Sequence, residues 1–278
     1  MHISDIHYSG LKDSSRLEKL YNIIKNYKTN YICITGDLID SNNVVESDIN
    51  SKYLIEWIKK LSKLSVILIS LGNHDIFLRN RHKLVKYYNK DFWNRIRSIN
   101  NVYVLDNEAY SDKNIYVYGF TLSYEYYYKY KKESVKLLLD EINKNRVNEI
   151  NENKLKICMM HSPLRLSEKS VKEKFNCYDL ILTGHMHNGV VPPIIDEIFD
   201  NDIGIISPGK KLFPKMARGI IIDNNILSIS AGIIKFHVTV TPLIRWANII
   251  YPIPINIINV TNKKCDTKKS YRYVKQNY

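Results

Sequence analysis

Five short groups of histidine, aspartate and asparagine residues have the types and spacing needed to bind metal ions. They are Asp5 with His7, Gly36-Asp37, Gly72-Asn73-His74-Asp75, His161, and Gly184-His185-Met186-His187. On an extended segment, residues two apart point to the same side, so Asp-x-His and His-x-His can each offer two ligands to one ion. Imidazole and carboxylate ligands suit Mn, Fe, Zn or Co, and the absence of cysteines from these groups argues against a structural zinc site.

The candidate ligands are too many for one ion. They number seven: Asp5, His7, Asp37, Asn73, His161, His185 and His187. Two ions that share one bridging carboxylate would use them all. We therefore expect a pair of divalent or trivalent cations, with Mn as the expected metal among Mn, Fe, Zn and Co.

Each group also has a simpler structural explanation when it is taken alone. A Gly-Asp pair after a strand is most often a turn, and a single histidine such as His161 can be a satisfied core residue. However, five of the eight histidines lie in these groups, and the groups follow one another at the ends of apolar runs. The combination favours one metal site. We expect the remaining histidines, His2, His82 and His237, to be structural or surface residues.

The elements that must position these groups can be predicted from hydrophobic patterns. Nearly continuous apolar runs at 31–35, 66–71, 157–160 and 180–183 are typical of strands that are covered on both faces. Between them, helical spacing occurs at Leu17, Leu20, Tyr21 and Ile24, at Leu54, Trp57, Ile58 and Leu61, and at Val135, Leu138, Leu139 and Ile142. This alternation predicts an α/β sandwich, in which ligands bind beyond the carboxyl ends of the strands.

The pattern changes from about residue 203 onward. Segments 218–222 and 226–230 flank the turn 223–225 and predict a β-hairpin, with further short segments up to Val260. We expect a second, largely antiparallel sheet that packs on the first within one domain of residues 1–261. Residues 262–278 carry six Lys and Arg against one Asp and are expected to be a basic, mobile tail.

The composition excludes several protein classes but selects no partner. The chain has 278 residues, of which 45% are hydrophobic and 25% charged, which excludes collagen-like, low-complexity and largely disordered classes. A net charge of +13 leaves nucleic acid, anionic membranes and phosphorylated substrates open. Four scattered cysteines form no CxxC pair, so the sequence predicts no disulfide framework.

The five groups, in this order, resemble the signature blocks of the calcineurin-like metallophosphoesterases. The resemblance implies a four-layer αββα sandwich of two mixed β-sheets flanked by helices, with a dinuclear metal site at the strand C-terminal ends. It implies that one ion is bound by Asp5, His7 and His187 and the other by Asn73, His161 and His185. It further implies that Asp37 bridges the ions, that His74 faces the substrate, and that Asp75 orients His74.

The same resemblance implies an activity. A phosphodiesterase or phosphatase would hydrolyse a phosphoester with a hydroxide held between the two ions. We expect a monomer that acts on a phosphoester substrate. Two alternatives remain: a metal-dependent nuclease of the same superfamily, and a non-catalytic scaffold of the same fold, against which the presence of every expected ligand argues.

Later segments resemble a bacterial branch that is often tethered to the membrane. They are His187-Asn188-Gly189, Ser207-Pro208-Gly209 and Ser230-Ala231-Gly232-Ile233. By this resemblance we expect a membrane anchor upstream of Met1 and a membrane-associated or cell-surface location, or a cytoplasmic one without the anchor. The apolar run 190–195 is either a lip for a lipid-linked or cell-envelope phosphoester or a core crossover between the sheets.

Basic residues interleaved with aromatic ones are the basis of the nuclease alternative. They occur at Arg79, Arg81, Lys83, Lys86, Tyr87 and Tyr88, and at Tyr126 to Tyr128 with Lys129, Lys131 and Lys132. Such stretches can track a nucleic-acid backbone and stack bases. They are more often surface helices whose lysine stems lie over tyrosines, and on that ground nucleic acid is not the expected partner.

Overall fold

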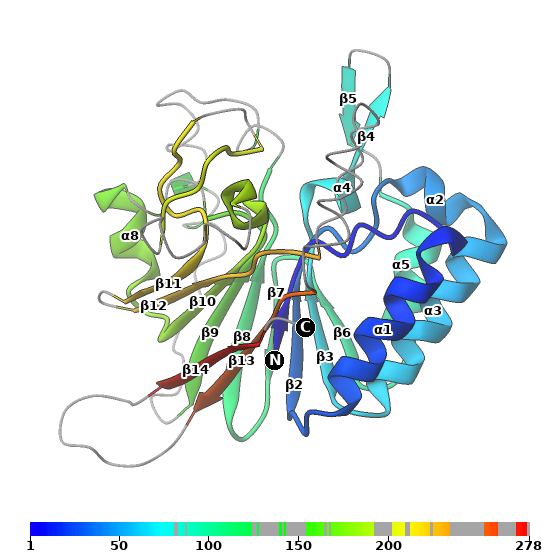
Figure 1. Ribbon diagram of the computed structural model, residues 1–278, viewed down its shortest axis with the longest axis horizontal. Helices are drawn as coiled ribbons and strands as arrows, with labels where there is room; N and C mark the ends of the chain where they lie inside the picture. The colour runs from blue at the N-terminus through cyan, green and yellow to red at the C-terminus, as the bar shows by residue number, and fades with distance from the viewer. Residues whose placement is uncertain are drawn as a thin grey trace.

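The computed structural model describes most of the chain. The described residues are 1–80, 83–86, 88–123, 127, 139–140, 142, 154–163, 166, 168–191, 202–208, 212–222, 225–233, 253–260 and 271–276. Two six-stranded sheets lie side by side with helices on their outer sides (Figure 1). The expected α/β sandwich of two mixed sheets flanked by helices is confirmed.

The first sheet has the strand order β14-β13-β1-β2-β3-β6. Its strands are β1 (His2–Ile3), β2 (Tyr31–Thr35), β3 (Val66–Ser70), β6 (Val102–Leu105), β13 (Ile255–Val260) and β14 (Tyr271–Gln276). The neighbours β1, β2, β3 and β6 are parallel, whereas β13 runs antiparallel to both β1 and β14. The carboxyl ends of β1, β2 and β3 therefore lie at one edge.

The second sheet has the order β11-β12-β10-β9-β8-β7. Its strands are β7 (Glu108–Ser111), β8 (Ile115–Phe120), β9 (Leu155–Met160), β10 (Leu180–Thr183), β11 (Gly219–Ile222) and β12 (Ile226–Ile229). The four central strands β12, β10, β9 and β8 are parallel, and only the edge strands are antiparallel. The expectation of a largely antiparallel second sheet is wrong, because β12 of the predicted hairpin adds in parallel to β10.

Two layers of apolar side chains hold the sandwich together. Between the sheets, Cys33 and Leu68 of the first sheet pack with Val117, Ile157 and Leu182 of the second. The alternate residues of the same strands face outward toward the helices, because successive side chains of a strand point to opposite faces. This arrangement explains why the strand sequences are almost continuously apolar.

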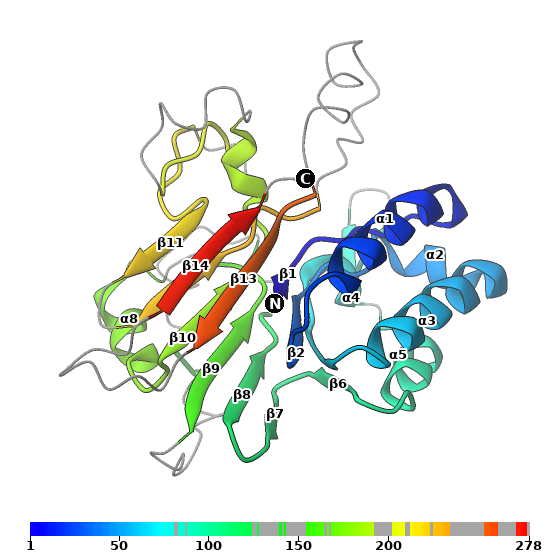
Figure 2. The same cartoon turned by 60° about the horizontal axis from the view of Figure 1, so that its bottom comes forward.

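The helices cover the outer faces of the two sheets (Figure 2). The longer ones are α1 (Ser14–Lys25), α3 (Asp48–Ser62), α5 (Lys90–Arg97) and α8 (Lys169–Phe175). The short ones are α2 (Asn42–Glu46) and α4 (Asn73–Ile76), and the strands β4 (Phe77–Asn80) and β5 (Lys83–Lys86) form a separate projecting hairpin. In the part of the chain that the structure describes, no helix is long and apolar enough to cross a bilayer.

The predicted amphipathic faces of α1 and α3 pack against each other and on the first sheet. Leu17, Leu20 and Ile24 of α1 are buried, and the Trp57 indole of α3 donates a hydrogen bond to the Leu17 carbonyl at 2.9 Å. Only residues 139, 140 and 142 of the third predicted helix are described, and they are helical. The rest of that prediction lies outside the described residues.

The C-terminal segment differs from the expected mobile tail. Tyr271–Gln276 forms β14, which pairs antiparallel with the whole of β13 at the edge of the first sheet. Alternating tyrosines and a valine favour a strand, and the many lysines of the segment obscured this tendency. The mobile-tail prediction is wrong for these six residues, while 262–270 lie outside the described part.

His2 is a buried polar residue between the two sheets. Its Nε2 atom lies 2.9 Å from Thr35 Oγ1, and its Nδ1 atom lies 3.4 Å from Ser228 Oγ on β12. Burial, and then the charge of the amino terminus, lower the pKa of His2 to about 3. The ring is therefore neutral in the folded protein at pH values where the unfolded chain would protonate it.

We expect the free energy of unfolding to depend on pH through His2. The folded pKa lies below the unfolded value near 6.5, so stability falls as pH drops below that value, by about 1.4 kcal/mol per pH unit. Between pH 7 and pH 5 the native protein should lose about 2 kcal/mol more than His2→Gln, measured by urea unfolding. Equal losses in the two proteins would contradict the assignment.

Candidate metal centre

The five groups of polar residues come together where parallel strands of both sheets end. They follow β1, β2 and β3 of the first sheet and β9 and β10 of the second. Backbone hydrogen bonds join the loops: the Asp5 amide donates to the Gly36 carbonyl at 3.0 Å and the His7 amide to the Asp37 carbonyl at 2.9 Å. The predicted convergence of loops at the strand ends is confirmed.

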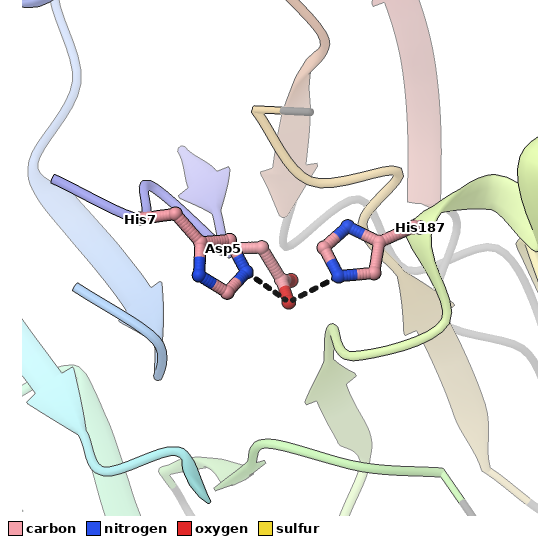
Figure 3. Close-up of side chains that lie close together, drawn as sticks. All are labelled: Asp5, His7 and His187. Carbon is pink, nitrogen blue, oxygen red and sulfur yellow. Dashed lines mark ion pairs between the residues drawn. The ribbon is translucent and has the colours of Figure 1, made fainter. Parts of the chain in front are cut away.

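Asp5, His7 and His187 form the first cluster (Figure 3). The Nε2 atoms of His7 and His187 lie 3.8 and 3.7 Å from Asp5 Oδ1, one on either side of the carboxylate. Their ligand atoms all lie within 4.8 Å of one another, which is close enough to surround a single cation.

Asp37, His161 and His185 form the second cluster. His161 Nε2 lies 3.1 Å from Asp37 Oδ2, and the rings of His161 and His185 lie 5.0 Å apart. Asp37 Oδ2 is also 3.6 Å from Nε2 of His7, which belongs to the first cluster. One oxygen of Asp37 therefore lies between the two clusters.

Several buried acceptor atoms at this site lack a hydrogen-bond partner among the described residues. They include Asn73 Oδ1, His7 Nε2 and His161 Nε2. A buried polar atom without a partner costs about 1–3 kcal/mol, so such atoms need an explanation. Bound cations would satisfy all three, and the set of imidazole, carboxylate and amide ligands therefore fits metal ions.

The backbone at the site adopts an unusual conformation. Asp5, His7, Asp37, His185 and His187 all have positive φ angles, between 46° and 67°. Residues with side chains rarely adopt this left-handed conformation, and those that do are concentrated at functional sites. Aspartate and histidine adopt it more often than most residues with side chains, but these residue types alone do not predict it.

Two glycines allow the loops to approach at backbone distance. A Cβ atom at Gly72 would lie 2.2 Å from Asp37 Oδ1, and one at Gly184 would lie 1.8 Å from Ser4 Oγ. Any side chain at either position would push a ligand-bearing loop away from its neighbour.

His74 stands at the start of α4 beside the first cluster. Its Nδ1 atom lies 2.5 Å from the Asp40 carbonyl oxygen, so Nδ1 carries the hydrogen and Nε2 is left for another partner. Its backbone amide donates to Asp37 Oδ1 at 2.9 Å. Burial lowers the pKa of His74, but the Asp37 carboxylate and the Asp40 carbonyl raise it above its ordinary value.

Asp75 was expected to orient the His74 ring, but the described hydrogen bonds of its carboxylate go to backbone amides instead. Its carboxylate accepts hydrogen bonds from the backbone amides of Gly72 at 2.8 Å and Ile39 at 3.2 Å, so it joins two loops. The group that orients His74 is the backbone carbonyl of Asp40. Sequence reasoning missed Asp40, and the available signal was its position three residues after Asp37 in the same loop.

The charged groups at the site shift one another's pKa values. Burial opposes ionisation of Asp37, but the rings of His161, His74 and His7 outweigh it and hold the Asp37 pKa well below its usual range. Burial also lowers the pKa of His161, whereas the carboxylates of Asp37 and Asp5 raise it to about 10. Asp37 is therefore held in its anionic form although it is buried, so its charge can compensate that of a bound cation.

Comparison with known families agrees with this geometry. The model of the calcineurin-like phosphoesterases matches residues 1–189. The chain belongs to this family. The phosphoesterase is also similar to an uncharacterized metallophosphoesterase of Aquifex aeolicus (strain VF5), with 27% identity over 229 residues that cover 79% of this chain and 76% of the relative. It is therefore a metal-dependent phosphoester hydrolase.

Proposed function

We propose that the phosphoesterase binds two divalent cations through the six residues of the two clusters together with Asn73. Asp5, His7 and His187 would hold one ion, and Asn73, His161 and His185 the other, with Asp37 shared between them. The observation that carries the proposal is the position of Asp37 Oδ2, 3.6 Å from His7 Nε2 and 3.1 Å from His161 Nε2. Mn²⁺ is the metal that we would supply first.

The neighbours of the ligands fix their orientation. His161 Nδ1 lies 2.7 Å from the Thr35 carbonyl, so in the neutral ring Nδ1 carries the hydrogen and Nε2 has the lone pair that an ion needs. The Asp5 carboxylate accepts hydrogen bonds from the His185 amide at 3.0 and 3.2 Å, which ties the first cluster to the second. Two bound cations would polarise the phosphoryl group and activate a water as nucleophile.

His74 would act on the phosphoryl group. Its Nδ1 atom is held by the Asp40 carbonyl, so a protonated Nε2 can donate to a phosphoryl oxygen or to the leaving oxygen. The ring of His7 lies edge-on against it at 4.7 Å, which places His74 beside the first cluster.

The turnover of a panel of phosphoesters tests this proposal. With Mn²⁺ supplied, aryl phosphomonoesters or phosphodiesters should be hydrolysed, a chelator should abolish turnover, and added metal should restore it. Metal analysis of the purified protein should find two ions per chain. Absence of stoichiometric metal would instead indicate the non-catalytic scaffold.

A lipid-linked substrate at a membrane surface is the narrower proposal. Leu212 and Phe213 are each 62% exposed. Their segment is linked to the η2 turn (His187–Val190) through Ile205, since the Phe213 amide donates to the Ile205 carbonyl at 3.0 Å and the Ile205 amide donates to the Gly189 carbonyl at 2.8 Å. The apolar run that begins at Val190 gives less support, because Val191 is buried and 192–195 lie outside the described residues.

The lipid proposal predicts a preference that Phe213→Ser should remove. The native phosphoesterase should hydrolyse a diacylated phosphoester faster than its water-soluble head group, and the variant should keep only the head-group rate. A native rate that is equal for both substrates would contradict it.

The nuclease alternative receives less support from the described tyrosines. Tyr88 stacks on Trp93 with ring centroids 6.1 Å apart, and buried Tyr127 lies 5.2 Å from the His185 ring. Tyr127 is buried and Tyr88 is half-buried against Trp93, so neither ring is fully exposed on the surface for bases to stack on. The rest of the basic and aromatic residues named for this alternative have side chains outside the described part of the chain. Including DNA in the substrate panel tests this alternative directly.

A further inference from the structure

Arg16, on the first turn of α1, contacts the loop that carries Asp5 and His7. Its Nη2 atom donates to the carbonyl oxygens of Ile6 at 2.8 Å and His7 at 3.3 Å. Its Nη1 atom donates to the Ile233 carbonyl at 3.0 Å. The guanidinium is largely buried, with 17% of the side chain exposed. A buried charge is costly unless it is paired and hydrogen-bonded, and Arg16 has both kinds of partner.

The guanidinium joins segments that are far apart in the sequence. Asp13 lies 3.5 Å away and anchors it from the helix side. Ile233 follows β12, and its own amide donates to the Ser4 and Asp5 carbonyls at 3.2 Å. The loop after β1 is thus held between Arg16 on one side and the segment after β12 on the other.

This loop needs external support because its conformation is unfavourable. Asp5 and His7 have φ angles of 53° and 46°, and each such residue costs about 1–3 kcal/mol unless its surroundings hold it. The carbonyls that Arg16 binds are those of Ile6 and of His7 itself. A return of either residue to an ordinary φ angle would turn these carbonyls away from the guanidinium.

We propose that Arg16 is a positioning residue for the ion of the first cluster, holding Asp5 and His7 in the geometry that binds it. The inference rests on the proposed function, since it assumes that the two clusters each bind an ion. A lysine could not replace Arg16 in full, because a single ammonium cannot reach carbonyls on two separate segments as a planar fork can.

The test measures the binding of each ion separately. Arg16→Met and Arg16→Lys should bind one Mn²⁺ as the native protein does and the other at least about 10-fold more weakly, in chelator competition. The spin-coupled signal of a manganese pair should give way to that of single ions. kcat should fall and KM should stay close to the native value, with a smaller loss for Arg16→Lys.

Arg97→Met is the matched control. Arg97 makes a hydrogen-bonded ion pair with Glu108 at 3.0 Å, far from the loop of Asp5 and His7 in the chain, and its loss should leave the binding of both ions unchanged. If Arg16 were only a structural residue, its substitution would weaken the binding of both ions and lower the melting temperature as well. Should Arg16→Met fail to fold, native-like binding of both ions by Arg16→Lys would still overturn the inference.

The outcomes for the native protein separate this inference from the proposed function. A native protein that binds fewer than two ions refutes the two-ion proposal and this inference with it. A native protein that binds two ions, together with variants that bind both equally well, refutes the role of Arg16 alone.

Discussion

Asp37→Asn is expected to lower kcat at least about 100-fold and to release metal from both clusters. Asparagine has the same shape as aspartate, so its Oδ1 atom can still accept the hydrogen bond from the His74 amide. The substitution removes the negative charge of the carboxylate, whose Oδ2 atom lies between His7 and His161. Both ions would lose the ligand that they are proposed to share, so the loss should exceed that for any residue that holds one ion alone.

Metal content and turnover must be measured together for this variant. Asp112→Asn is the matched control, because Asp112 also accepts several hydrogen bonds, including one from the Tyr31 hydroxyl at 2.6 Å, but belongs to neither cluster. The control should keep both ions and the native rate. An Asp37→Asn protein with two bound ions and near-normal turnover would refute the bridging role.

His74→Asn should separate rate from metal binding. We expect both ions to stay and kcat to fall by about 100- to 10,000-fold, which is the range for loss of a general acid. The backbone amide of residue 74 would still donate to Asp37, so the shared ligand keeps its position. Loss of metal on this substitution would contradict the separation.

The dependence of the rate on the leaving group should show which substrate oxygen His74 contacts. If its Nε2 atom protonates the leaving oxygen, the rate loss in His74→Asn should be largest for substrates with poor leaving groups. If it stabilises a phosphoryl oxygen instead, the loss should be similar for all of them. Asp75→Asn is a useful contrast: its carboxylate contacts backbone amides, so the variant should lose stability without a change in leaving-group dependence.

Side-chain chemistry made most of the site predictable. A histidine or aspartate at a strand end reveals its potential as a ligand through its type alone, and these groups do come together in the structure. Asp40 escaped prediction because its backbone carbonyl, which every residue has, makes the bond to His74. Arg16 escaped for the same reason, since all three acceptors of its guanidinium hydrogen bonds are carbonyl oxygens.

The positions of the strands in the sequence were more predictable than the way in which the strands pair. The run 180–183 was expected as a buried strand, and it is one, but the apolar pattern of a strand covered on both faces is the same in either sheet. Pairing depends on which neighbour fills the remaining edge, and this is decided by contacts distant in sequence. Hence the parallel addition of β12 to β10 and the return of β13 to the first sheet were not foreseen.

The pairing of β12 with β10 limits how far the protein can be shortened. A fragment that ended at Gly189 would keep all seven candidate ligands and the whole region matched by the family model. It would lose β12, which flanks the strand before His185, and Ile233, which binds the loop of Asp5. In such a fragment, β10 would become an edge strand whose backbone groups on one side are unpaired. We therefore expect the shortest fragment that folds and hydrolyses phosphoesters to extend beyond residue 189, where the match to the family model ends.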